Sequence, residues 1–89
     1  MLSSKQCELA RTMTQDKTTD LQINQEFESM KPSDKILSAA VVEKLLQLHD
    51  MPFDKGFKFL VNDFTHIASE FYISPATLFC VYMENKSKK

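Results

Sequence analysis

The chain has 89 residues, 43% of them hydrophobic, with one glycine and a formal net charge of −1. This length gives one domain with a modest core and little room for an enclosed substrate cleft. The composition excludes a disordered chain, and the single glycine argues against the tight turns of an all-β fold, so we predict an all-α fold. The near-neutral charge provides no bulk attraction for nucleic acid, which would need a local basic patch.

Cysteine spacing and hydropathy exclude further classes. Cys7 and Cys80 are far apart in the sequence and lack the spacing typical of metal or redox sites. We therefore expect two free thiols, no metal and no cofactor. The sequence has neither a secretory signal at its start nor the run of about 18 apolar residues that spans a bilayer. We expect no membrane contact and a cytoplasmic or nuclear location.

The chain divides by composition into three parts. Residues 1–32 are expected to be an N-terminal arm or docking segment, residues 33–86 a helical domain and residues 87–89 a basic tail. Only one of the nine aromatic residues, Phe27, lies in the first part. The core is therefore expected to belong mainly to the second part.

Within the arm, a short amphipathic helix is predicted after Ser3 or Ser4, because either hydroxyl is suited to cap it. Its apolar positions recur at three- and four-residue spacing through Cys7, Ala10 and Met13. The following stretch, TTDLQINQEFESM, fits a strand edge as well as a helix. It stays open as a linker or a docking arm.

The first helix of the domain is predicted from Ser33 to about His49. Ser33 follows a proline and is suited to cap the helix, while Asp34 favours the positive end of its dipole. Pro52 cannot continue the helix because it lacks an N–H group. The expected buried stripe consists of Leu37, Val41, Leu45 and Leu48, with Val42 and Leu46 beside them.

A second helix is predicted from Asp54 or Lys55 to Phe71. Its apolar residues alternate at three- and four-residue steps: Phe57, Leu60, Val61, Phe64, Ile67, Ala68 and Phe71. After a turn at Tyr72 and Ile73, a third helix is predicted to run from Pro75 to about Asn85. Ser74 is suited to cap it, and Pro75 fits the first helical position, where an N–H is not needed.

The segment Phe64–Met83 resembles the helix-turn-helix of bacterial transcription regulators, including the AraC-type. The motif IASEFYISPATL carries the resemblance: Ala68 matches the small residue between the helices, and Ile73 the apolar turn residue. Tyr72 stands at the position in the turn where that family frequently has a glycine. The resemblance implies a three-helix core whose last two helices form the helix-turn-helix. In that family, the matching positions point into the major groove of DNA. In this chain they are Ser74, Pro75, Ala76, Phe79, Cys80 and Met83.

A second stretch, SPATLFCVYMENK, resembles the first cyclin-box helices of Pho80-like cyclins. In those proteins a Ser-Pro step leads into an apolar helix that ends in a tyrosine, an aliphatic residue, an acid and a base. Asn85 stands where the base is expected. Both resemblances imply a helix that starts at Ser74 and Pro75.

The third helix is apolar around more of its circumference than three helices can hide. Either the N-terminal arm or a second protein could cover the remaining apolar side of this helix, and both alternatives stay open. From the second we predict a small, non-enzymatic regulatory or adaptor protein that binds a protein partner, or itself as a homodimer. The expected partner-binding residues are Phe79, Cys80 and Met83, with Tyr82 and Tyr72 at the edge.

The alternative hypothesis is a DNA-binding transcription regulator. Base readout needs hydrogen-bonding side chains, and phosphate contacts need cations or amides. Ser74 and Thr77 supply the hydroxyls, and Lys86, Lys88 and Lys89 supply the charge. These five residues are the expected DNA contacts in that case.

The sequence gives no reason to expect an enzyme or a small-molecule substrate. Cys80 lies in the middle of a helix among apolar neighbours, which makes a thiol inert. A chain with one glycine has no glycine-rich phosphate loop. Asp63, His66 and Glu70 share a helix face, which we interpret as a solvated face and not as a metal site.

Overall fold

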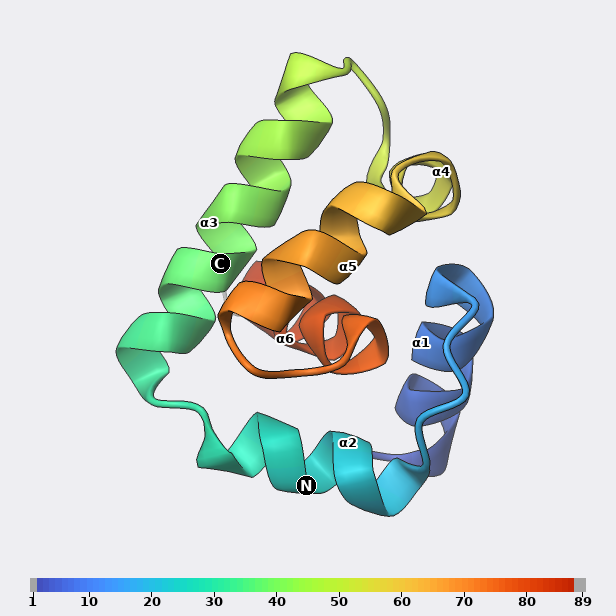
Figure 1. Cartoon of the computed structure of the whole chain (residues 1–89), viewed down its shortest axis with the longest axis vertical. Coiled ribbons are helices and arrows are strands. Elements are labelled where there is room, and N and C mark those ends of the chain that lie inside the picture. Colours follow the sequence, from blue (N-terminus) through green and yellow to red (C-terminus); the bar gives the residue numbers. More distant parts are fainter. Residues whose placement is uncertain (1, 88–89) are drawn as a thin grey trace.

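The computed structural model describes residues 2–87, with all their side chains except those of residues 53 and 54. This part of the chain contains six helices and no strand, which confirms the predicted all-α class. They are α1 (Ser4–Thr14), α2 (Asp20–Ser29), α3 (Pro32–Leu48), α4 (Phe53–Phe59), α5 (Val61–Glu70) and α6 (Pro75–Ser87). Figure 1 shows the other helices arranged around α6.

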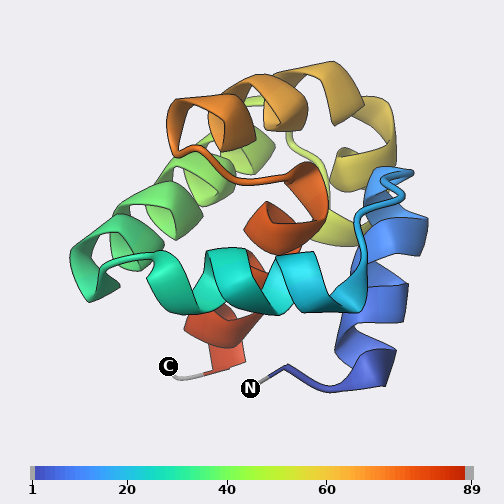
Figure 2. The ribbon, with the colours of Figure 1, turned by 60° about the horizontal axis from the view of Figure 1, so that its bottom comes forward.

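The central helix, α6, is buried on every side. Seven consecutive residues of this helix are buried: Ala76, Thr77, Leu78, Phe79, Cys80, Val81 and Tyr82. Figure 2 shows that α2, α3 and α5 lie around it on three sides, with α1 next to α2. A helix that is apolar all round is stable only when it is enclosed in this way. Its predicted start is confirmed, because α6 begins at Pro75 and the Ser74 hydroxyl accepts from the Thr77 N–H at 3.3 Å.

The N-terminal segment forms two helices that pack on α6. Ser3 caps α1 in a capping box with Gln6, and Thr19 caps α2. The stretch that fitted both strand and helix is therefore helical. Cys7 and Ile23 are fully buried in the same cluster as the aromatic residues of α4, α5 and α6. The arm is thus part of the common core.

Helix α3 begins one residue before the predicted start. Pro32 occupies the first turn, where its fixed φ suits a helix, and Ser33 is already inside the helix and exposed. Asp34 lies in the first turn as predicted. After Leu48 the chain turns at Asp50, whose φ of 51° is left-handed, and Pro52 starts the approach to α4.

The predicted single helix from residue 54 to residue 71 is wrong, because the chain bends at Leu60 between α4 and α5. Leu60 has φ −106° and ψ 31°, outside the helical range. The rings of Phe57 and Phe64 stack with centroids 4.1 Å apart. On a straight helix, residues seven apart are separated by about 10 Å along the axis. The bend is what allows both rings to meet in the core.

Gly56 gives a first test of this packing. It lies on α4, and a Cβ built at this position would collide with the Leu46 side chain of α3, which is itself buried. We expect Gly56→Ala to lower the free energy of unfolding by about 1 kcal/mol, since overpacking outweighs the roughly 1 kcal/mol gained in helix propensity. Urea denaturation measures the change. In a Leu46→Ala background the same substitution should become neutral or stabilising, and an equal cost in both backgrounds would contradict the proposed collision.

Candidate functional site

The sequence-predicted partner face is covered by the protein's own N-terminal helices. Phe79 and Cys80 are almost completely buried, and only Met83 of these three is partly exposed. The expectation of an exposed face at these residues is therefore wrong. The physical reason is that α1 lays its small residues Cys7 and Ala10 against α6. The arm is the cover that the sequence left open as the first alternative.

Polar contacts hold α1 in this position. The Gln6 amide donates to the Glu84 carboxylate at 2.8 Å, and the Cys80 thiol lies 3.9 Å from the Gln6 carbonyl oxygen. Burial raises the pKa of Cys80 to about 12, which keeps its thiol protonated at neutral pH. What remains of the predicted face is a hollow of about 160 Å³ that Phe79, Cys80 and Met83 line together with Leu9.

The two tyrosines expected at the edge of that face lie elsewhere. Tyr82 is buried on the opposite side of α6, and its hydroxyl donates to the Glu43 carboxylate of α3. Tyr72 lies in the α5–α6 turn with a left-handed φ of 60° and is 92% exposed. The five predicted partner-binding residues therefore do not form one surface.

The expected DNA contacts are also placed unfavourably for that role. Thr77 is fully buried, and its hydroxyl donates to the Glu26 carboxylate at 2.6 Å. Ser74 donates its backbone N–H to the same carboxylate at 3.0 Å. A carboxylate at this position repels phosphate, so the expectation that both hydroxyls touch DNA is wrong. Lys86 is exposed near the end of α6, while Lys88 and Lys89 lie outside the described residues.

Two carboxylates of the arm hold the first turn of α6. Asp16 accepts from the Ala76 N–H at 3.1 Å, and Glu26 accepts from Ser74 and Thr77. The N–H groups at a helix start have no partner within the helix, and negative charge is favourable there. Burial raises the pKa of Glu26, while hydrogen bonds from Thr77 and Ser74 lower it. Together the hydrogen bonds outweigh burial, so the pKa lies below its usual value. The arm is thus fastened to the central helix electrostatically.

Among the described residues, α3 carries more exposed large apolar side chains than any other helix, partly where the sequence predicted burial. Leu37 is 55% exposed and Leu48 is 76% exposed, so the expected buried stripe is wrong for these residues and for the exposed Val41. The residues that pack inward are Ser38, Ala39, Val42 and Leu46, so the expected burial of Val42 and Leu46 is confirmed. Two of them are small, which lets α3 approach the bulky side chains of α6 closely. We call Ile36, Leu37, Val41 and Leu48 the outer face of α3.

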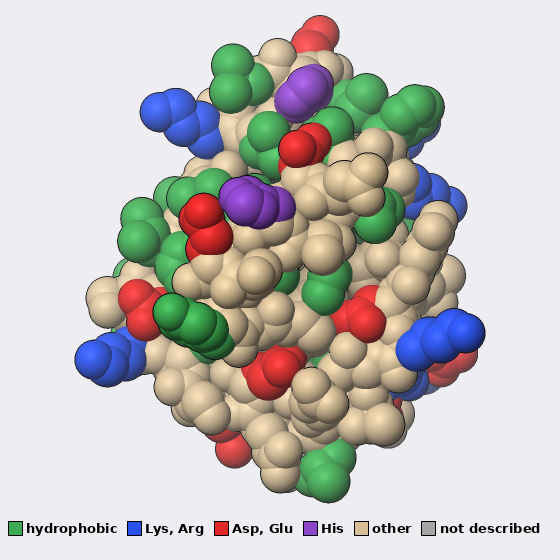
Figure 3. Space-filling view, viewed as in Figure 1, with side chains coloured by type: hydrophobic (Ala, Val, Ile, Leu, Met, Phe, Trp, Pro, Cys, Tyr) green, Lys and Arg blue, Asp and Glu red, His purple; other side chains and the backbone are tan. Residues whose placement is uncertain are grey.

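Figure 3 shows how this surface appears on the folded molecule. Hydrophobic side chains lie along the edge formed by α3, with charged side chains between them. Ile36 and Leu37 lie in one turn of α3, Val41 in the next and Leu48 at the C-terminal end, on a helix that is about 25 Å long at the usual rise per residue. A sequence signal for this exposure existed, because α3 carries apolar residues on opposite sides and one side cannot face the core.

A groove runs beside the outer face, between α3 and the second half of α6. Its middle part is a hollow of about 770 Å³ lined by Ile36, Ala39, Ala40, Glu43, Lys44, Gln47, Tyr82, Asn85 and Lys86. A second hollow continues it toward Phe27 and Pro32, and a third toward Asp50 and Met51. Because adjoining hollows share lining residues, we treat them as one feature, the α3/α6 groove.

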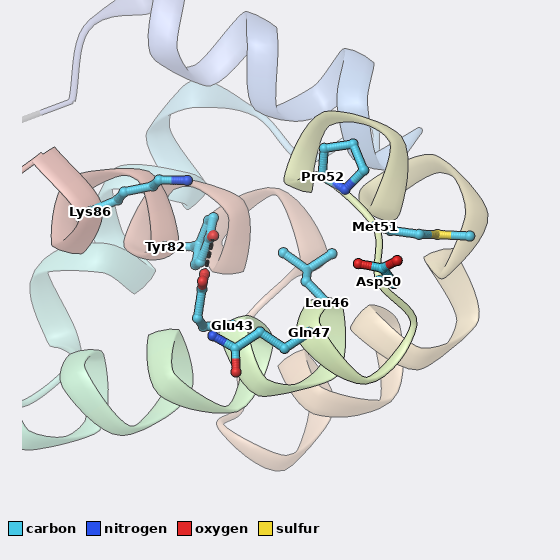
Figure 4. A pocket seen from close by; sticks show the side chains of 8 residues that line it. All are labelled: Glu43, Leu46, Gln47, Asp50, Met51, Pro52, Tyr82 and Lys86. Atoms are coloured by element: carbon cyan, nitrogen blue, oxygen red, sulfur yellow. Dashed lines mark hydrogen bonds between the residues drawn. The ribbon is translucent and has the colours of Figure 1, made fainter.

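Figure 4 shows the end of the groove near the α3–α4 connection. Tyr82 reaches from α6 toward α3, and the dashed line marks its hydrogen bond to Glu43. Burial raises the pKa of Tyr82 above its usual value, and the Glu43 carboxylate adds to this effect. The ammonium group of Lys86 lies 5.7 Å from the centre of the Tyr82 ring. The groove therefore has a fixed floor made from both helices.

The described residues offer no arrangement typical of metal binding. No group of three or more His, Cys, Asp and Glu side chains is positioned to hold an ion in residues 2–87. His66 pairs with Glu70 at 3.4 Å, and both side chains are well exposed, as a solvated face predicts. Within the same residues, no helix has the length and apolar character needed to cross a membrane.

Comparison with protein-family models, with curated proteins and with solved structures gives no match to this chain. The outer face of α3 and the groove next to it are therefore the features of the molecule that bear on function.

Proposed function

We propose that this protein is a non-enzymatic adaptor or regulatory module that binds a protein partner along α3. The observation that supports this most directly is the exposure of Leu37 and Leu48 on the longest helix of the molecule. A helix of a small globular domain normally turns its polar side to water, and contiguous exposed apolar surface marks interaction sites. The partner covers the outer face of α3 and extends into the α3/α6 groove.

The dimensions fit such a role. An interface of standard size buries about 800 Å² on each partner, which is more than one exposed side chain supplies. The outer face and the groove together run along α3 from Ile36 to Leu48. Burying an exposed leucine contributes on the order of 1 to 2 kcal/mol, so a few such residues account for a complex of moderate affinity.

We expect Leu37→Ser to weaken partner binding about tenfold while leaving the fold intact, because the side chain is more than half exposed. A photo-crosslinking residue at Ala40, which lines the groove, would capture the partner in the native host. The captured protein would then be purified and titrated by calorimetry against the wild type and the variant. The matched control is Leu21→Ser, since Leu21 is a leucine on α2 that is 69% exposed.

Light scattering on the purified protein measures its oligomeric state and so tests whether the partner is a second copy of the chain. Dissociation of such a dimer by Leu37→Ser, and not by Leu21→Ser, supports binding through α3. If the captured protein binds both variants and the wild type with the same affinity, and no dimer responds to Leu37, the proposed docking surface is wrong.

A further inference from the structure

The charges around the α3/α6 groove indicate which chemistry a partner needs, and this inference rests on the function proposed above. The middle hollow is apolar where Ala39 and Ala40 line it together with Ile36. Alanines leave room for another helix to approach closely, as small residues do at tight helix contacts. The hollow thus has the shape that suits the apolar stripe of a helix.

Two lysines stand on the two walls of this hollow. Lys44 belongs to α3 and Lys86 to α6, and both line the same space. Among the described residues, Glu43 is the only carboxylate that lines this middle hollow, and it already accepts the hydrogen bond of the Tyr82 hydroxyl. Glu84 and Asp50 line the adjoining hollows. The middle of the groove therefore presents an apolar floor with a positive charge on either side, although the whole chain carries a net charge of −1.

We infer that the middle of the groove binds an amphipathic helix of a partner protein whose apolar stripe has acidic side chains on both flanks. The apolar stripe covers Ile36 and Ala40, and the flanking carboxylates pair with Lys44 on one wall and Lys86 on the other. Charge pairs of this kind select the partner and its orientation more than they raise affinity. The amide side chains of Gln47 and Asn85, which line the same hollow, add hydrogen bonds to the rim.

The test uses two synthetic helical peptides with the same leucine stripe, one flanked by glutamates and one by lysines. Binding to the isotope-labelled protein is followed by chemical-shift changes in two-dimensional NMR spectra. We expect the acidic peptide to bind at least tenfold more tightly than the basic one, with the largest shifts at Ile36, Ala40 and Asn85. The preference should weaken as salt is raised, because the lysines are near the surface.

A charge reversal tests the assignment to these two lysines. Lys44→Glu/Lys86→Glu should reverse the preference in favour of the basic peptide. The control Lys5→Glu/Lys17→Glu changes the net charge equally at two exposed lysines of the arm segment and should leave the preference unchanged. Urea denaturation of each variant shows whether the fold is retained.

The possible failures separate this inference from the proposed function. If both peptides bind the groove equally, or if the control reverses the preference as well, the acidic partner is wrong while docking on α3 stands. If neither peptide shifts groove resonances but Leu37→Ser still weakens a captured partner, the groove is not the helix site. If Leu37→Ser has no effect either, the proposed function fails with it.

Discussion

Phe57→Ala is expected to remove most of the stability of the domain. Phe57 is fully buried at the centre of an aromatic cluster. Its ring stacks on Phe64 and meets Phe79 edge to face, with centroids 4.9 Å apart. Truncating a buried phenylalanine costs about 3 to 5 kcal/mol, and a domain of this size has about 4 to 13 kcal/mol in total. Urea denaturation followed by circular dichroism measures the loss.

The matched control for this substitution lies two residues away. Phe59 belongs to the same short helix, α4, but is 76% exposed. Phe59→Ala should therefore change the free energy of unfolding by less than about 0.5 kcal/mol. Similar losses for the two variants would contradict the central position of Phe57, because the cost would then come from helix α4 itself and not from the core.

Glu26→Gln is expected to destabilise the protein by about 2 kcal/mol at neutral pH, since hydrogen bonds to a charged group contribute about 1.5 to 3 kcal/mol. Glu26 accepts from Ser74 and Thr77 at the start of α6. Its pKa in the folded protein lies below the usual value of 4.5. The carboxylate therefore stabilises the fold above pH 4.5, and this contribution is lost as the pH falls through the folded pKa.

The difference between wild type and Glu26→Gln should accordingly be largest near pH 7, begin to shrink below about pH 4.5, and reach its minimum below the folded pKa of Glu26, where neither side chain is charged. Denaturant midpoints at a series of pH values follow this difference. Glu28→Gln is the control, because Glu28 lies on the same helix and is exposed. A difference that stays constant down to pH 3 would show that the charge of Glu26 does not hold the arm.

Local signals in the sequence predicted the helix starts well. Ser74 and Pro75 begin α6, and Ser3 caps α1, because capping depends on residues within one turn of each other. The bend at Leu60 was not predictable in this way. It follows from the stacking of Phe57 on Phe64, a contact that the three- and four-residue spacing of a continuous helix does not reveal.

The buried side of α3 shows a second limit of periodicity. Apolar residues lie all around this helix, so spacing alone did not decide between Leu37 and Val42 as the inward side. Small residues decided it, because Ser38 and Ala39 let the helix pack closely on α6. Spacing therefore predicted the helix and the burial of Val42 and Leu46, but it also placed Leu37 and Leu48 inward, and these exposed leucines became part of the candidate site.

The apolar character of α6 was recognised from the sequence, but its cover was assigned to a partner. The arm contributes a minority of the buried apolar residues, none of them aromatic: Leu2, Cys7, Ala10, Ile23 and Met30. Composition therefore placed the core in the later part of the chain. The arm is also held by Asp16 and Glu26, whose long-range bonds to the start of α6 leave no local pattern in the sequence.

The central position of α6 has a consequence for synthesis on the ribosome. The five surrounding helices are translated first, yet each of them needs α6 to cover its apolar side. A nascent chain that ends before Tyr82 lacks the segment around which the others assemble. Folding of these six helices must therefore wait until α6 has emerged, and until then the earlier helices expose apolar surface that chaperones bind.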